Sequence, residues 1–134
     1  MDRKQGSLDA NILLRLIVRD IPEQSDSALE LIDQGKRFHV ADTAIIETIF
    51  VLERYYQIPR TEIADIMQVL MGHSKLDLNS ELFRKAMELF VQHSKLSIED
   101  CCLAIYAQLN NALPLWTFDR KLANQVDGVV QLLR

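Results

Sequence analysis

Four acidic residues stand at the edges of apolar segments, where a carboxylate is costly to bury. They are Asp9 in Leu-Asp-Ala-Asn, Glu47 in Ile-Ile-Glu-Thr-Ile-Phe, Asp100 in Ser-Ile-Glu-Asp and Asp119 in Trp-Thr-Phe-Asp. A folded chain tolerates several buried carboxylates together mainly around a cation. If the fold gathers these four, they predict a site for a divalent metal ion.

The three aspartates also have a purely structural interpretation. Asp9 and Asp119 each precede an expected helix, and an aspartate at that position commonly caps the helix through its side chain. Asp100 stands three residues after Ser97, which is the spacing of a capping box. Each aspartate taken alone is therefore either a helix cap or a metal ligand.

Glu47 has different surroundings, because Ile45, Ile46 and Ile49 make nearly every face of its expected helix apolar. It either belongs to an exposed stripe with Glu53 and Arg54 or points into a site. Positions 47 and 53 are about 600° apart around a helix, so they do not share one stripe. This spacing favours the site.

The elements that must position these acids alternate along the chain. Short apolar runs predict strands, and longer runs with helical spacing predict helices. Asp42 is expected to cap a helix that begins at Thr43. Expected strands are 38–41, 76–78, 113–118 and 129–133, with a short one before Asp9, and expected helices are 11–18, 25–34, 42–56, 61–71, 80–93, 97–110 and 120–124.

This alternation predicts an α/β fold with a mainly parallel sheet. Asp9 and Asp119 follow strands, whereas Glu47 and Asp100 lie near helix starts. Strand ends and helix N-termini flank the same edge of a parallel sheet, where such folds bind their ligands. The first strand is the element that the sequence predicts least clearly, because only Leu8 is apolar before Asp9 and the preceding residues are polar.

The bulk composition narrows the class of protein. The 134 residues, 49% apolar and 25% charged, suit one globular domain spanning 1–134. A net charge of −4 argues against a protein that coats nucleic acid through bulk electrostatics. The adjacent Cys101 and Cys102 predict core residues of a reducing compartment, and the scattered His39, His73 and His93 argue against zinc. No apolar run reaches membrane-spanning length, and we expect a cytoplasmic protein.

Four segments, taken in their order along the chain, resemble those of PIN-domain ribonucleases. They are most similar to the segments of VapC-like toxins of bacterial toxin–antitoxin pairs. They are Leu-Asp-Ala-Asn-Ile-Leu-Leu-Arg from Leu8, the helix that carries Glu47, Ser-Ile-Glu-Asp-Cys-Cys-Leu-Ala from Ser97, and Thr-Phe-Asp-Arg-Lys-Leu from Thr117. The chain departs from this family at its start, because family members have an apolar strand before the first aspartate.

The resemblance implies a three-layer α/β/α sandwich and metal-dependent cleavage of RNA phosphodiesters. It implies that Asp9, Glu47, Asp100 and Asp119 are catalytic metal ligands for Mg²⁺ or Mn²⁺, supported by Asn11 and Thr117. Such toxins form homodimers and are silenced by an antitoxin protein. Candidate contacts to RNA phosphates are Arg15 and Arg120, followed by Arg19, Arg54 and Lys121.

Three other functions remain open. A non-catalytic PIN-like module would bind RNA or protein without cleaving it. A haloacid dehalogenase-type phosphatase would need a second acid two residues after Asp9, where this chain has Asn11. A 5′-flap DNA nuclease would need insertions that grip DNA, for which the chain has little spare length.

Overall fold

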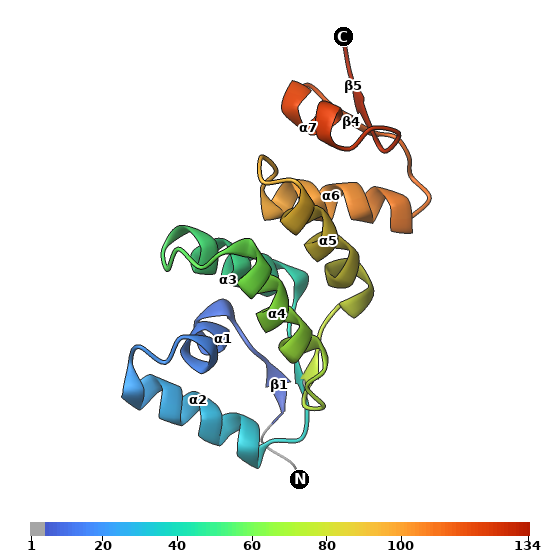
Figure 1. Ribbon diagram of the computed structural model, residues 1–134. Coiled ribbons are helices and arrows are strands. Elements are labelled where there is room, and N and C mark those ends of the chain that lie inside the picture. The colour runs from blue at the N-terminus through green and yellow to red at the C-terminus, as the bar shows by residue number, and fades with distance from the viewer. Residues whose placement is uncertain (1–4) are drawn as a thin grey trace. The chain divides into compact units, whose positions relative to one another are not determined.

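The computed structural model describes residues 5–134, which fold as two compact units (Figure 1). The first unit ends at Asn79 and the second spans Ser80–Arg134. Each unit contains its own parallel sheet. No helix within residues 5–134 is long and apolar enough to cross a membrane.

The sheet of the first unit has three parallel strands in the order β1-β2-β3. Gly6 lies opposite Phe38, and Phe38 lies opposite Leu76. Parallel neighbours need long crossover connections, and here each crossover contains two helices. The elements are β1 (Gly6–Ser7), α1 (Ala10–Ile17), α2 (Pro22–Gln34), β2 (Phe38–His39), α3 (Asp42–Arg54), α4 (Arg60–Met71) and β3 (Leu76–Asp77).

The core of the first unit is built from helical faces with the expected spacing. Helix α1 packs against both α2 and α3. Ile45, Ile49 and Leu52 of α3 recur every three or four residues and are fully buried, because that spacing places them on one face. Ile63, Met67 and Leu70 form the corresponding buried face of α4.

The second unit combines a helix pair with a small two-stranded sheet. Helix α5 (Ser80–Gln92) packs against α6 (Ile98–Leu109), where Cys101 and Cys102 are buried as predicted. Strands β4 (Leu115–Thr117) and β5 (Val130–Leu132) pair in parallel, and α7 (Arg120–Gln125) connects them.

The predicted class, α/β with parallel strands, is confirmed, and all predicted helices and strands form within a few residues of their expected bounds. The first strand is short, as expected from its polar sequence, and Leu8 after it is buried. Residues 1–4, which include part of the departure from the family pattern, lie outside the described residues. Helix α2 begins at Pro22, three residues before its expected start, because proline suits the first helical position.

One capping prediction is wrong. Helix α3 begins at Asp42, and the capping position belongs to Ala41. Asp42 therefore lies in the first turn, and its carboxylate accepts a hydrogen bond of 3.4 Å from the Asn79 side chain. A carboxylate in the first turn is still favourable, because it faces the positive end of the helix dipole.

Candidate functional site

Each of the three predicted aspartates caps a helix. The Oδ1 of Asp9 accepts a hydrogen bond of 3.0 Å from the backbone N–H of Ile12 at the start of α1. The Oδ1 of Asp119 accepts bonds of 2.9 and 3.3 Å from the backbone N–H groups of Lys121 and Leu122. These bonds satisfy donors that a helix start otherwise leaves unpaired.

Asp100 completes a capping box at the start of α6. Its Oδ2 accepts a hydrogen bond of 3.2 Å from the backbone N–H of Ser97. In return, the Ser97 hydroxyl oxygen accepts a bond of 3.1 Å from the backbone N–H of Asp100. The capping box predicted from the Ser97 spacing is therefore confirmed.

The caps use only one oxygen of each carboxylate. Within residues 5–134, the Oδ2 of Asp9, the Oδ1 of Asp100 and the Oδ2 of Asp119 accept no hydrogen bond. A carboxylate can accept through both oxygens, so each cap fixes the side chain and leaves one oxygen available. The same aspartate can therefore be a cap and a ligand.

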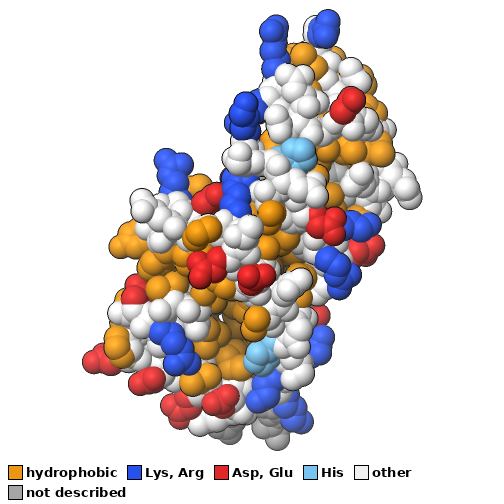
Figure 2. Space-filling view, in the orientation of Figure 1, with side chains coloured by type: hydrophobic (Ala, Val, Ile, Leu, Met, Phe, Trp, Pro, Cys, Tyr) orange, Lys and Arg blue, Asp and Glu red, His pale blue; other side chains and the backbone are white. Residues whose placement is uncertain are grey.

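The four acids are less buried than their apolar surroundings predicted. Asp9, Glu47 and Asp119 are exposed, and Asp100 is partly buried. Figure 2 shows Asp and Glu side chains (red) on the face of the molecule that it draws. The expectation of a burial cost is wrong for the three exposed acids. Asp9 and Asp119 stand at helix starts, at the ends of apolar segments, and Glu47 is on the exposed side of α3. The argument for a cation site therefore depends on the carboxylate oxygens as metal ligands and not on the cost of burying them.

Glu47 lies on the exposed stripe of α3. Thr43, Phe50 and Arg54, which are spaced by three or four residues from one another or from Glu47, are exposed as well. The Arg54 guanidinium lies 6.0 Å from the centre of the Phe50 ring on this stripe. The helix therefore exposes Glu47 and buries its neighbours Ile45 and Ile49. Glu53 does not belong to this stripe, and its Oε2 forms an ion pair of 2.6 Å with the Nε of Arg60.

Asp9 opens onto a surface depression of about 600 Å³. Asn11 and Arg15, two residues predicted to assist the site, line the same depression. Asn11 is exposed, so its amide is accessible to a ligand there. The remaining lining residues are Ile12, Ile21, Glu23, Gln24 and Ser27.

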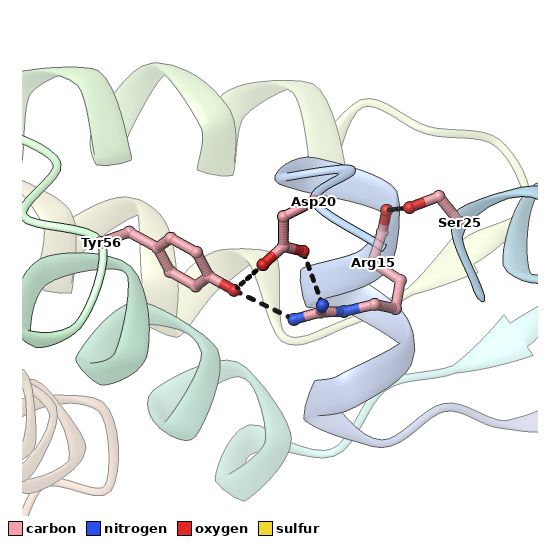
Figure 3. Close-up of polar contacts among 4 residues, drawn as sticks. All are labelled: Arg15, Asp20, Ser25 and Tyr56. Atoms are coloured by element: carbon pink, nitrogen blue, oxygen red, sulfur yellow. Dashed lines mark hydrogen bonds and ion pairs between the residues drawn. The ribbon is translucent and has the colours of Figure 1, made fainter. Parts of the chain in front are cut away.

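Arg15 is held at this depression by a network of polar contacts (Figure 3). Its guanidinium forms an ion pair with Asp20 and donates a hydrogen bond of 3.1 Å to the Tyr56 hydroxyl. The Tyr56 hydroxyl donates a bond of 2.7 Å to the second Asp20 oxygen. Because the side chain of Arg15 is only 11% exposed, it is a fixed charge and not a mobile surface arginine.

The network shifts the ionisation of its members. The hydrogen bond from Tyr56 is the main reason that the pKa of Asp20 lies below its usual value. The same bond is the main reason that the pKa of Tyr56 is raised, because it stabilises the protonated phenol. Both shifts favour the ionised carboxylate and the neutral phenol.

Asp20 and Tyr56 were not identified from the sequence. They are 36 positions apart, and neither stands in a recognisable motif. Only the packing of α1 against α3 brings the segments that follow these helices together. No local signal in the sequence could have identified this pair.

Thr117 supports Asp119 directly. Its hydroxyl oxygen accepts a hydrogen bond of 3.0 Å from the backbone N–H of Asp119, and it thereby holds the turn between β4 and α7. Arg120, the other predicted phosphate contact, is exposed and forms no ion pair with any residue in 5–134.

Asp9 and Glu47 belong to the first unit, and Asp100 and Asp119 belong to the second. Among residues 5–134, no three His, Cys, Asp or Glu side chains are grouped in a way that could hold a metal ion. The shared four-acid centre therefore stays a prediction.

Comparison with known proteins assigns the chain to a family. The model of the PIN domain matches residues 7–128, a range that includes all four acids. A comparison with curated protein sequences gives no match. PIN domains are commonly nucleases, so the match supports a hydrolase that acts on nucleic acids. The chain belongs to the PIN domain family.

Proposed function

We propose that this PIN-domain protein is an endoribonuclease that hydrolyses RNA phosphodiesters with the help of Mg²⁺ or Mn²⁺. The observation that carries the proposal is the geometry of the three capping aspartates. Asp9, Asp100 and Asp119 are each fixed by backbone N–H groups and each keep one unbonded oxygen within residues 5–134.

The donors fit a hard divalent cation. Asp9, Glu47, Asp100 and Asp119 supply only carboxylate oxygens, the ligand type that Mg²⁺ and Mn²⁺ prefer. When bound, such an ion would activate a water molecule and neutralise charge on the reacting phosphate. In this proposal all four acids serve the same PIN domain, whose match covers residues 7–128.

The other residues would bind and orient the substrate. Asn11 offers an amide at the depression beside Asp9. Arg15, which Asp20 and Tyr56 hold in place at this depression, would supply positive charge to a phosphate bound there. Thr117 holds the backbone of Asp119 and keeps its carboxylate in place.

The biological role that we propose is the toxin of a toxin–antitoxin pair. Its support is the similarity of the four acidic segments to VapC-like toxins. The role implies a cytoplasmic protein, an antitoxin partner that blocks the nuclease, and a homodimer. The alternative is a non-catalytic PIN-like module that binds RNA or protein.

A panel of cellular RNAs tests the nuclease proposal. Wild type and Asp119→Asn are incubated with the RNAs, with and without Mg²⁺ or Mn²⁺. We expect cleavage only by wild type with metal. Cleavage by Asp119→Asn at the wild-type rate would reject the assignment of Asp119. RNA binding without cleavage under any condition would favour the non-catalytic module.

A further inference from the structure

The first unit has an apolar groove that the proposed nuclease site does not use. Its volume is about 340 Å³, and helices α1, α2 and α4 form most of its walls. Figure 2 shows hydrophobic side chains (orange) around a hollow where Figure 1 draws these three helices. The apolar walls include Leu16, Ile17, Leu29, Ile32, Ile66 and Val69.

Two apolar side chains of this groove are open to solvent. Val69 is 70% exposed and Leu29 is 37% exposed. They belong to helices whose other apolar residues, such as Ile32 and Met67, are buried. A single exposed apolar residue is common on a protein surface, but several that gather around a depression indicate a binding surface.

Arg19 lines this groove in an unusual backbone conformation. It directly follows Val18, the C-cap of α1, and its φ is 61°. Glycine is the usual residue at this position of a helix end, because any other side chain is crowded against its own backbone in the left-handed region. Arg19 is exposed and forms no ion pair with a residue in 5–134. An arginine where glycine suits the backbone better indicates that its guanidinium serves something other than the fold.

Two charged residues line the groove, and they belong to opposite ends of α2. Arg19 precedes this helix, and Asp33 is its penultimate residue. The 13 residues of α2 span about 20 Å. At the Asp33 end, the Lys75 ammonium donates hydrogen bonds of 3.0 and 2.9 Å to the carbonyls of Ile32 and Asp33 and adds a positive charge. The Arg19 end therefore favours an anion, and the carboxylate of Asp33 is far from it.

We infer that this groove binds a small amphipathic anion, with a carboxylate head at Arg19 and an apolar chain along the walls of α1, α2 and α4. A volume of about 340 Å³ lies within the range of small-molecule sites, which are mostly apolar with a few polar groups that fix the orientation of the ligand. The inference does not depend on the proposed nuclease function. Arg19 follows the C-terminal end of α1, whereas Asp9 caps its N-terminal end.

A helix of a partner protein is the other class of occupant for an apolar groove. Such a helix uses several anchor residues spaced along its length, and a stable protein interface extends over a much larger surface than this groove. A single free cation at one end of a short apolar groove matches a ligand with one charge and one chain better.

Isothermal titration calorimetry with octanoate tests the inference, and 1-octanol serves as the uncharged control. Both are titrated into the full chain in EDTA, so that bound metal plays no part. We expect octanoate to bind and 1-octanol to bind at least tenfold more weakly, because only octanoate has a charge for Arg19.

Arg19→Gly separates binding from folding. It should weaken octanoate binding about tenfold, which corresponds to the loss of one charge-assisted hydrogen bond. Its urea midpoint should be no lower than that of wild type, because glycine adopts the φ of 61° without strain. Arg19→Lys keeps the charge and should keep most of the binding.

Val69→Asp tests the apolar wall. It places a negative charge where the chain of octanoate would lie and should abolish binding, whereas its fold should persist because the position is 70% exposed. Val91→Asp is the matched control, because Val91 is an exposed valine of α5, in the second unit. It should bind octanoate like wild type.

Three outcomes would overturn the inference. Octanoate binding that is unchanged in both Arg19→Gly and Val69→Asp would place the ligand elsewhere. Equal affinity for octanoate and 1-octanol would show that no anion is recognised. Absence of octanoate binding to wild type would reject the small ligand and favour a partner helix in the groove. None of these outcomes bears on the nuclease proposal, which is tested by cleavage of RNA.

Discussion

The Tyr56 hydroxyl donates a hydrogen bond of 2.7 Å to the carboxylate of Asp20, 36 positions away in the chain. Arg15 closes this pair into a three-membered network at the depression beside Asp9. The network holds the segment after α1 against the segment after α3. It therefore stabilises the fold and keeps Arg15 oriented at the candidate site.

Tyr56→Phe should make the stability of the protein less sensitive to acid. The folded-state pKa of Asp20 is lowered, so its contribution is present above the unfolded value of about 3.9 and is lost as the pH falls through the folded pKa. Without the phenol, the folded pKa moves back toward its ordinary value. Urea unfolding at several pH values should show wild type more stable near neutral pH, with the difference shrinking in acid.

The control for this prediction is Tyr55→Phe, because Tyr55 is the neighbouring residue and is 73% exposed. It should leave the pH dependence unchanged. The raised pKa of Tyr56 gives a second test, because its contribution is present below about pH 10 and is lost as the pH rises through the raised value. A difference between wild type and Tyr56→Phe that is constant at all pH values would contradict the role of this bond.

Substitutions at Asp119 should separate its role as a cap from its role as a ligand. Asn caps a helix about as well as Asp, so Asp119→Asn should unfold close to wild type, whereas Asp119→Ala should lose about 1 kcal/mol. Both should lose RNA cleavage, because neither supplies a carboxylate. Thermal or urea unfolding and a cleavage assay on the three proteins measure the two effects; an active Asp119→Asn would show that Asp119 is only a cap.

Ser97→Ala should destabilise the second unit by about 1 kcal/mol, because it removes one half of the capping box. Ser97→Thr should restore most of the loss, since threonine carries the same hydroxyl group. Urea unfolding provides the measurement. Equal stability of Ser97→Ala and wild type would mean that the Asp100 side chain alone caps α6.

Metal binding should stabilise the folded protein through the carboxylate of Asp100 and not through that of the neighbouring Glu99. A ligand that binds only the folded state at 100 times its dissociation constant adds about 2.7 kcal/mol. The melting temperature of wild type should therefore rise with added Mn²⁺, and Asp100→Asn should reduce this rise. Glu99→Gln is the matched control, because Glu99 is exposed and takes no part in the capping box. An equal rise in wild type and Asp100→Asn would remove Asp100 from the ligand set.

The helices, the strands and the capping geometry of the aspartates could be predicted from the sequence. Alternating apolar runs predicted the parallel α/β class, and the spacing of Ser97 and Asp100 predicted the capping box that forms. These features depend on residues within a few positions of one another. Local periodicity and capping preferences are therefore sufficient to predict them.

The exposure of the acids and the contacts between distant residues depend on how the helices pack, and they could not be predicted from the sequence. The apolar neighbours of Glu47 suggested burial, but the helix turns them to the core and leaves Glu47 exposed. The Tyr56–Asp20 bond depends on the packing of α1 against α3, and the depression shared by Asp9, Asn11 and Arg15 depends on the packing of α1 against α2. Such contacts arise from packing between helices, and the spacing of residues within one segment has no information about them.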